Sequence, residues 1–322
     1  MFSHSQGVIV RYLDNVRLLT ANSNPALAEE ISKCIGISLS NVVVSRFSDG
    51  EVFVKIEENI RGCDVFIVQS TNPPAENLME LLIMLDAARR ASAARVTAVI
   101  PYFGYGRQDR KDQPRVAITA KLVANMIVAA GANRVLMMDL HASQIQGFFD
   151  IPSDHLFSSR IFNDYFKLNP IPDAVAVTPD VGSVKMARAF ANKLRYGLAI
   201  VDKRRYTHNQ SEVMTIIGDV KNKNIVIRDD MVDTAGTLVQ AAEALVEQGA
   251  NEIYACCTHG VFSGDAYEKI EKSPIKKLLV SNSIAFDTNE RCSKIQKLSM
   301  AELFAEAIKR IAGGESISSL FD

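Results

Sequence analysis

The sequence lacks the features that mark secreted, membrane-spanning or strongly charged proteins. Its five cysteines are scattered without CxxC spacing, which argues against a disulfide framework and a zinc site and fits reduced thiols in a cytoplasm. Nowhere do about 18 apolar residues run together, and the first residues lack a basic start followed by an apolar core. A formal net charge of −1 gives no global basic field. We therefore expect a cytoplasmic protein that binds neither membrane nor nucleic acid, and that binds anions only through local clusters.

Two common nucleotide-binding motifs are missing as well. The chain contains no GxxxxGK[ST] motif. Its one GxG sequence, Gly104-Tyr105-Gly106, continues with Arg107-Gln108-Asp109 and not with the further glycine of GxGxxG. These absences argue against a Walker-type NTPase and against a dinucleotide-binding enzyme.

What the sequence does contain is an alternation of short apolar runs with amphipathic segments. A chain of 322 residues, 48% of them hydrophobic, can build two cores, because single cores stop growing near about 250 to 300 residues. The alternation predicts an α/β fold with mostly parallel sheets. The expected strands are Val16–Thr20, Val42–Arg46, Val65–Val68, Arg95–Ile100, Val135–Asp139, Ala174–Thr178, Leu198–Val201, Asn224–Ile227, Glu252–Thr258 and Lys277–Val280. The expected helices are Asn77–Ala91, Ile118–Ala130, Gly182–Leu194, Thr237–Gln248 and Met300–Ile311.

A faint internal repeat accompanies this alternation. Residues 118–141 and 235–259 each read as a helix, a Gly-Ala-Asn triplet, a strand and a polar end that closes on histidine. The triplets at Gly131 and Gly249 lie 118 residues apart. The repeat suggests two similar α/β halves with a boundary near 151–159. The alternative is that Gly-Ala-Asn is a helix stop with a glycine C-cap, which recurs by chance in α/β proteins.

One polar stretch directly follows an expected strand. RDDMVDTAGT (228–237) places three carboxylates and two hydroxyls after the apolar run 224–227. In open α/β sheets, ligands bind beyond the carboxyl ends of strands, where the start of the next helix presents free N–H groups to an anion. Gly236 would let the backbone approach a phosphate, and we expect Thr237 or Asp233 to open the helix.

The carboxylates in this stretch need a different partner. Asp229 and Asp230 would repel a phosphate, whereas carboxylates accept hydrogen bonds from paired ribose hydroxyls or bind a divalent cation. The stretch therefore predicts a site for a sugar phosphate. The alternative is a solvated turn with aspartate as the helix N-cap, but three acids within five positions exceed what a cap requires.

Several motifs, in the order of one known family, extend this interpretation. Residues 225–237 resemble the phosphoribosyl diphosphate loop of the type I phosphoribosyltransferase fold, and residues 16–321 are similar to the ribose-phosphate diphosphokinases, also called phosphoribosyl pyrophosphate synthetases. Besides that loop, the matching motifs are RFSDGEVFVKI (46–56), IPYFGYGRQDRKD (100–112), MDLHASQIQGFFDIP (138–152), TPDVGSVKMA (178–187), VDKRR (201–205), THGVFSG (258–264) and GESISSLF (314–321). The resemblance implies two similar type I phosphoribosyltransferase-like domains, each a mostly parallel sheet flanked by helices. We place them at 1–155, with the ATP side and the oligomer contacts, and 156–322, with the sugar loop and a last helix packing back on the first domain.

The same resemblance implies an activity, a cofactor and an assembly. It implies Mg²⁺-dependent transfer of a diphosphoryl group from ATP to the 1-hydroxyl of ribose 5-phosphate, with release of AMP, in a pathway of nucleotide biosynthesis. It also implies a homo-oligomer, a hexamer built from dimers, in which the hairpin around Asp49-Gly50 reaches a neighbouring subunit's site.

The resemblance assigns a role to each group of residues. The catalytic pair is Lys203 and Arg205. The ATP contacts are Phe47, Asp49, Gly50, Glu51, Arg107, Gln108 and Asp112. Ribose 5-phosphate contacts are Arg205, Asp229, Asp230, Asp233, Thr234, Ala235, Gly236 and Thr237. The Mg²⁺ ligands are His141 and Asp180. Regulatory contacts fall on Arg61, Ser143, Gln146 and the stretch 316–321, which includes Ser316 and Ser318.

Each assignment has a plainer alternative in the residues themselves. Lys203 and its basic neighbours are either a mobile loop that closes over reacting phosphates or a solvated surface run. His141, after an apolar strand, is either a metal ligand or a hydrogen-bonded core residue. The Asp49-Gly50 pair predicts a β-turn between strands 42–46 and 51–56, and Phe47 beside it offers a flat face to adenine. The charged run 107–112 is either a nucleotide-binding loop or a solvated one.

The chain departs from the family pattern at several positions. Asn59 replaces a common serine, so the same effector response is not expected. Asp180-Val-Gly-Ser replaces Asp-Ala-Gly-Gly, Arg228 replaces an apolar or small residue, and the basic loop lacks a proline-rich tail. Two other functions remain open: a nucleobase phosphoribosyltransferase, against which motifs 46–51 and 107–112 count, and a non-catalytic regulatory subunit of the same family, against which the basic pair counts.

Overall fold

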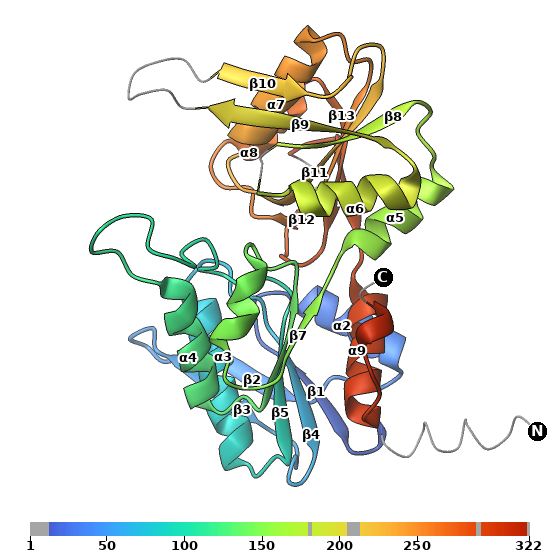
Figure 1. The fold of residues 1–322 in the computed structure, drawn as a ribbon. Coiled ribbons are helices and arrows are strands. Elements are labelled where there is room, and N and C mark those ends of the chain that lie inside the picture. The colour runs from blue at the N-terminus through green and yellow to red at the C-terminus, as the bar shows by residue number, and fades with distance from the viewer. Residues whose placement is uncertain (1–12, 180–181, 205–212, 288–290, 321–322) are drawn as a thin grey trace, which may run out of the picture. The chain divides into compact units, whose positions relative to one another are not determined.

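The computed structural model describes residues 13–179, 182–204, 213–287 and 291–320 of the chain (Figure 1). These residues form two compact units. Unit 1 comprises 1–157, 283–285 and 299–322, and unit 2 comprises 158–282 and 286–298. Both units are layered α/β structures with largely parallel sheets, as the alternation in the sequence predicted.

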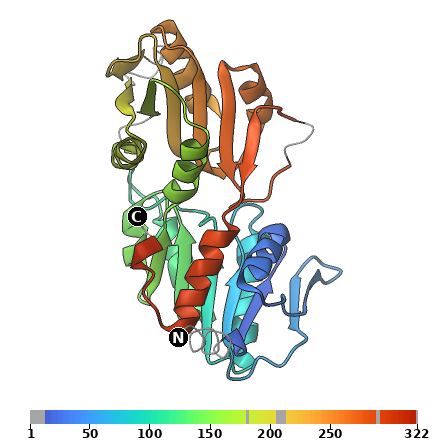
Figure 2. The ribbon, with the colours of Figure 1, turned by 90° about the vertical axis from the view of Figure 1, so that its right-hand side faces the viewer.

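Unit 1 contains a five-stranded parallel sheet with helices on both faces. The strand order is β1 (Val16–Thr20), β4 (Asp64–Val68), β5 (Arg95–Ile100), β6 (Arg134–Met138) and β7 (Ser153–Leu156). Helices α3 (Glu76–Arg90) and α4 (Thr119–Ala130) cover one face, and α2 (Pro25–Ile35) and α9 (Ala301–Gly313) cover the other (Figures 1 and 2). The unit also contains two 3₁₀ helices, η1 (Ser143–Phe148) and η2 (Ser318–Leu320).

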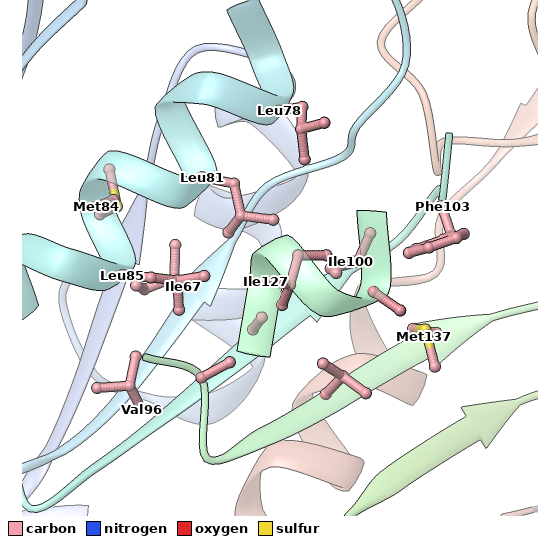
Figure 3. Packing of buried hydrophobic residues seen from close by; sticks show 14 of the residues in the cluster. Ile67, Leu78, Leu81, Met84, Leu85, Val96, Ile100, Phe103, Ile127 and Met137 are labelled. Carbon is pink, nitrogen blue, oxygen red and sulfur yellow. The ribbon is translucent and has the colours of Figure 1, made fainter. Parts of the chain in front are cut away.

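The core of unit 1 fills the space between the sheet and the α3–α4 layer. Leu81, Met84 and Leu85 on α3 meet Ile67 and Val96 on the strands, and all five are fully or almost fully buried (Figure 3). Neighbouring residues of a strand point to opposite faces, so Phe66, which is also buried, lies on the α2–α9 side. This packing fixes the strand ends from which the loops of the unit emerge.

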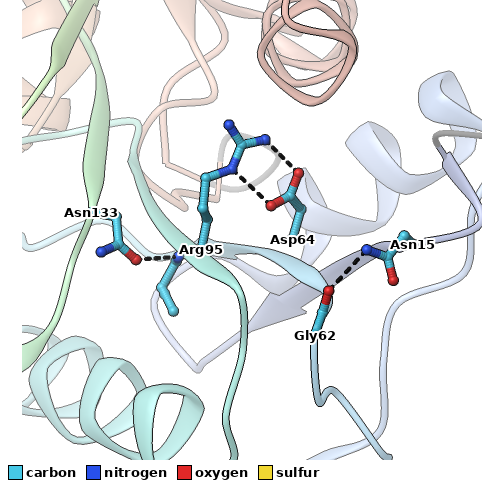
Figure 4. A network of polar contacts seen from close by, with 6 residues as sticks. Asn15, Gly62, Asp64, Arg95 and Asn133 are labelled. Atoms are coloured by element: carbon cyan, nitrogen blue, oxygen red, sulfur yellow. Dashed lines mark hydrogen bonds and ion pairs between the residues drawn. The ribbon is translucent and has the colours of Figure 1, made fainter.

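At the amino ends of β4 and β5 a polar network fixes the strands (Figure 4). Arg95 donates from Nε to Asp64 Oδ1 at 2.8 Å and from a terminal nitrogen to Oδ2 at 2.5 Å, a two-pronged contact that raises the pKa of Arg95. Asn133 Oδ1 accepts from the Val96 N–H at 2.8 Å, and Asn15 donates to the Gly62 carbonyl at 2.9 Å. The network lies at the edge of the sheet opposite the carboxyl ends where ligands of this fold class bind.

A separate two-stranded hairpin projects from unit 1. Strands β2 (Val42–Arg46) and β3 (Val52–Ile56) pair antiparallel. Gly50 has a φ of +96°, a left-handed conformation that glycine adopts without strain, and its N–H donates to the Phe47 carbonyl at 2.9 Å. The turn predicted from Asp49-Gly50 is confirmed.

Unit 2 contains a seven-stranded sheet. The strand order is β10 (Val213–Ile217), β9 (Gly197–Arg204), β8 (Ala174–Thr178), β11 (Asn224–Val232), β12 (Ile253–Gly260), β13 (Ile275–Ser281) and β14 (Ile295–Leu298). The β10–β9 pair is antiparallel, and the other pairs are parallel. Helices α5 (Ser159–Leu168) and α6 (Val184–Leu194) pack on one face, and α7 (Gly236–Glu247) and α8 (Ala266–Lys272) pack on the other.

The two sheets repeat one topology, but not in the register that Gly-Ala-Asn suggested. The order β1-β4-β5-β6-β7 in unit 1 matches the order β8-β11-β12-β13-β14 in unit 2. In unit 1, Leu39 forms a parallel bridge to Leu18 on β1, which corresponds to the pairing of β9 with β8 in unit 2. β8 begins 158 residues after β1, and β12 begins 158 residues after β5. The α7–β12 segment therefore corresponds to α3–β5, whereas the triplet at Gly131 follows α4. The predicted correspondence of 118–141 with 235–259 is wrong, and the triplets act as helix stops in which Gly131 and Gly249 have positive φ.

This topological match identifies the segment of unit 1 that corresponds to the sugar loop predicted for unit 2. It is the connection from β4 to α3, residues 69–75, and the chain fills it with its own polar groups. Glu80, only 2% exposed, accepts from Asn22 N at 3.0 Å, Asn22 Nδ2 at 2.9 Å and Gln69 Nε2 at 3.1 Å. The Glu80 carboxylate thus ties the start of this connection, at Gln69, to Asn22 after β1.

We expect Glu80→Ala to destabilise the protein by about 3 kcal/mol, because it leaves buried donors without their charged acceptor. Thermal unfolding of the purified protein measures the effect. Glu76→Ala, on the same helix and with a side chain 46% exposed, is the matched control and should shift the transition little. Equal shifts of the unfolding transition for the two variants would show that the buried hydrogen bonds of Glu80 do not stabilise the protein more than an exposed glutamate does.

Candidate functional site

The acidic stretch lies where β11 passes into α7. Pairing with β8 ends at Ile227, but pairing with β12 continues to Val232, so Asp229 and Asp230 lie within a strand, near its carboxyl end, and not in a loop. The strand expected to stop at Ile227 is therefore five residues longer. Both carboxylates are half-buried, and Asp229 Oδ1 accepts from the Asp230 N–H at 2.9 Å.

The turn after β11 leaves the start of α7 open to an anion. Ala235 is the N-cap, with φ 60° and ψ 0°, and no side chain caps the helix, so the expectation that Thr237 or Asp233 caps it is wrong. The first N–H groups of a helix have no acceptor within it, and here they include those of Gly236 and Thr237. A left-handed residue before a helix also turns successive N–H groups toward one side, a conformation that binds anions.

Gly236 itself is not required by the backbone. Its φ lies outside the left-handed region, and a Cβ placed on it would meet its nearest atom, Thr234 Oγ1, at 3.8 Å, an ordinary contact. Alanine would therefore fit in the free protein. A close approach by a ligand is the remaining physical reason for glycine at this position.

A second loop holds this turn in place. Val261 and Phe262 donate their N–H groups to the Val232 carbonyl at 2.9 and 3.2 Å, and Ser263 donates to the Asp233 carbonyl at 3.0 Å. Gly260 permits the contact, because a Cβ there would lie 2.4 Å from the Phe262 ring. Residues 261–263 of the THGVFSG motif thus support the acidic turn through their backbone.

Charged residues near the end of β11 contribute to the pKa shifts of two buried cysteines. Burial raises the pKa of the Cys256 thiol to about 12, with Arg228 opposing the rise and Asp229 adding to it. Burial also raises the pKa of Cys257 well above its usual value, and Asp229 adds to that shift. Both thiols are held neutral and unreactive, so they do not serve as nucleophiles.

The basic motif lies at the same edge of the unit 2 sheet. Lys203 is the second-last residue of β9 and pairs with Met214 on β10. Because β9, β8 and β11 run parallel, their carboxyl ends share one edge, which places Lys203 and the acidic turn on the same side of the sheet. Arg205 and Asp180 lie outside the described residues.

His141 and the charged loop lie together in unit 1. His141 is exposed directly after β6, and a Cβ on Gly106 would lie 3.7 Å from the His141 Cβ. Asp109 Oδ2 accepts from Gln144 Nε2 at 2.6 Å, which ties the loop to η1. The core alternative for His141 is wrong, because the side chain faces solvent.

The remaining ATP contacts divide between two places. Gln108 and Asp112 are exposed on the loop with Arg107, and Gln108 Oε1 accepts from the Thr119 hydroxyl at the start of α4. Phe47, 54% exposed, stands at the hairpin turn beside the exposed residues Asp49, Gly50 and Glu51. The hairpin is a sheet of its own, which suits a surface that meets a ligand or a partner.

The predicted regulatory residues all lie in unit 1. Gln146 Nε2 donates to the Ser143 carbonyl at 2.9 Å within η1, and the Ser316 and Ser318 hydroxyls are 2.9 Å apart beside η2. The Arg61 N–H donates to Asn59 Oδ1 at 3.1 Å in an exposed turn. Phe321 lies outside the described residues.

The described residues contain no group of three or more His, Cys, Asp or Glu side chains placed to hold a metal ion. The predicted Mg²⁺ ligands, His141 and Asp180, stay a prediction, because Asp180 lies outside the described residues. Within the same residues, no helix combines the length and the apolarity needed to cross a membrane.

Comparison with known proteins assigns the chain to a family. A family model described as the N-terminal domain of ribose phosphate pyrophosphokinase matches residues 16–131, and one described as the phosphoribosyl synthetase-associated domain matches residues 205–322. The ribose-phosphate pyrophosphokinase of Chlorobaculum tepidum is 56% identical over 308 residues, covering 95% of each chain. That of Caldanaerobacter subterraneus is 55% identical over 97% of this chain and all of the relative. The crystal structure of phosphoribosylpyrophosphate synthetase from Mycobacterium smegmatis matches with a TM-score of 0.88 and 36% identity, over 93% of this chain and 99% of that one. The chain therefore belongs to the ribose-phosphate pyrophosphokinase family.

Proposed function

We propose that the protein transfers the diphosphoryl group of Mg-ATP to the 1-hydroxyl of ribose 5-phosphate, which yields 5-phosphoribose 1-diphosphate and AMP. The observation that carries the proposal is the juxtaposition at the end of β11. Two half-buried carboxylates, suited to ring hydroxyls, lie near the end of the strand, and the turn that follows leads to a helix start without a side-chain cap, suited to a terminal phosphate.

Each residue of the site has a place in this proposal. The N–H groups and hydroxyls of 233–237 bind the 5-phosphate, and Asp229 and Asp230 hold the ring hydroxyls. The 1-hydroxyl oxygen forms a bond to the β-phosphorus and gives up its proton to solvent water, while the bond from the β-phosphorus to the oxygen of the α-phosphate breaks and AMP leaves. Lys203 and Arg205 stabilise the charge that develops on the transferred oxygens.

On the ATP side, the proposal uses Phe47, the turn residues 49–51 and the loop residues Arg107, Gln108 and Asp112. His141 and Asp180 are the proposed protein ligands of Mg²⁺, which supplies charge neutralisation at the phosphates when bound. His141 is exposed, so its imidazole would be accessible to a hydrated Mg²⁺ ion.

The domain roles, the hexameric assembly, the cytoplasmic location and the effector contacts are proposed on the same family basis. Unit 1 would supply the ATP side and the oligomer contacts, and unit 2 would supply the sugar site. The effector contacts would involve Arg61, Ser143, Gln146, Ser316 and Ser318.

One assay separates this function from its rivals. The purified protein is given ATP, Mg²⁺ and ribose 5-phosphate, and then a free nucleobase with 5-phosphoribose 1-diphosphate. AMP release in the first mixture and no nucleotide in the second is the expected result. Nucleotide formation in the second mixture would indicate a phosphoribosyltransferase. The absence of product in both mixtures would indicate a non-catalytic subunit.

The Mg²⁺ assignment makes its own prediction. His141→Ala should raise the Mg²⁺ concentration for half-maximal activity by at least about tenfold, because a ligand is lost. Activity titrated with MgCl₂ at fixed ATP measures it. Asp150→Asn, a nearby surface change, is the control. Identical titration curves for wild type and His141→Ala would remove His141 from the site.

A further inference from the structure

Arg228 is the largest fully buried side chain of the described residues, and it directly precedes the acidic pair. Its exposed fraction is 0%, and it lies in the middle of β11, directly after the apolar residues 225–227. Burying a guanidinium is unfavourable unless hydrogen bonds compensate for its lost hydration. The position therefore calls for an explanation beyond packing.

The guanidinium joins three elements of unit 2. One terminal nitrogen donates to Ser158 Oγ at 2.7 Å and to Thr258 Oγ1 at 3.1 Å, and the other donates to the Asp229 carbonyl. Ser158 is the N-cap of α5, and Thr258 is on β12. The two hydroxyls are 2.7 Å apart, so they form one polar cluster around the arginine. The Phe162 ring centroid lies 4.8 Å from the guanidinium carbon.

This cluster lies at the point where β11 loses one of its two neighbouring strands. β8 stops pairing with β11 at Ile227, so from Arg228 onward one neighbouring strand, β12, remains. The Asp229 carbonyl that Arg228 holds belongs to the peptide joining Asp229 to Asp230. The guanidinium thus fixes the backbone unit that carries both carboxylates.

We propose that Arg228 is a positioning residue for the sugar site: it holds the Asp229-Asp230 peptide so that both carboxylates face the ring hydroxyls of ribose 5-phosphate. The inference rests on the proposed function, since it assumes that these carboxylates bind the sugar. It concerns the sugar alone, so ATP binding should not depend on it.

The test compares Arg228→Met and Arg228→Lys with the wild type in the AMP-release assay. Methionine fills much of the volume without hydrogen bonds, and lysine keeps the charge but cannot reach several acceptors in a fixed fork. We expect Arg228→Met to raise KM for ribose 5-phosphate by about tenfold or more, with KM for ATP within about twofold. Arg228→Lys should fall between Arg228→Met and the wild type.

Val226→Ala is the matched control, because Val226 lies two residues earlier on the same face of β11 and packs against the same α5 core. It should lower thermal stability and leave both KM values unchanged.

Thr258→Val provides a second variant if Arg228→Met does not fold, since it removes one acceptor of the Arg228 guanidinium at nearly constant side-chain shape. It should raise KM for ribose 5-phosphate about threefold or more without affecting KM for ATP.

The outcomes separate the two levels of the proposal. A wild-type protein that releases no AMP overturns the proposed function. An active wild type whose Arg228→Met variant keeps its KM for ribose 5-phosphate overturns only the role of Arg228. A rise in both KM values that Val226→Ala reproduces would mean that Arg228 serves stability alone, and it would also overturn the role.

Discussion

Lys203→Ala is expected to slow AMP release by about 10²- to 10⁴-fold, with a modest change in KM for either substrate. The reason is that the ammonium group acts on charge that develops as the diphosphoryl group leaves AMP, and that charge is absent from the bound substrates. Lys203 sits at the carboxyl end of β9, at the sheet edge it shares with the acidic turn. Steady-state kinetics with ribose 5-phosphate and Mg-ATP measures the change.

Lys193→Ala is the control for Lys203→Ala, because Lys193 is an exposed lysine in the last turn of α6 in the same unit. Its removal changes the net charge equally and should leave turnover as it was. A Lys203→Ala enzyme with near wild-type turnover would show that the basic motif is a solvated run. A variant with normal turnover and a raised KM would make Lys203 a binding residue and not a catalytic one.

Gly236→Asp should lower kcat/KM for ribose 5-phosphate by about 10²- to 10³-fold, because a carboxylate a few ångströms from the 5-phosphate repels it. The same change should leave the fold intact. The backbone of Gly236 tolerates a side chain, and an acidic group in the first turn of a helix is favourable by about 0.3 to 1 kcal/mol. Activity and thermal stability are thus expected to move in opposite directions.

Two further variants sharpen this prediction. Gly236→Ala adds the Cβ without the charge, and it should weaken sugar binding while preserving stability. Gln240→Glu adds the charge one turn further along α7, beyond the open N–H groups, and should have little effect on KM. If Gly236→Asp binds ribose 5-phosphate as the wild type does, the phosphate is held somewhere else.

Strong local signals explain what the sequence predicts correctly. Val16–Thr20, Val42–Arg46, Arg95–Ile100 and Ala174–Thr178 have the predicted boundaries, because each is an apolar or β-branched run between turn residues. The missed strand β10 reads VMTII, an apolar and β-branched run that the prediction overlooked. Two other missed strands carry weaker signals: β7 reads SDHL and β14 reads IQKL. Such short, polar strands at sheet edges depend on tertiary pairing, which a single sequence does not display. Helix α2 did carry a signal, since Asn24 caps it ahead of Pro25.

The candidate site shows the same division between residue identity and geometry. Residue chemistry and order along the chain are enough to propose the acidic pair, Gly236 and Lys203 as candidates. The end of β11 is harder to place, because a charged Arg228 reads as the start of a turn, whereas it is buried and bonded across three elements. The helix cap is likewise misread, since Ala235 adopts a left-handed conformation that its side chain does not favour. Both depend on contacts between residues distant in sequence.

The most direct test of the central claim is a crystal structure of the protein with ribose 5-phosphate. Our account predicts that the 5-phosphate lies within hydrogen-bonding distance of the N–H groups of Gly236 and Thr237, with the ring hydroxyls on Asp229 and Asp230. A sugar phosphate bound elsewhere, with this turn left empty at saturating ligand, would contradict it.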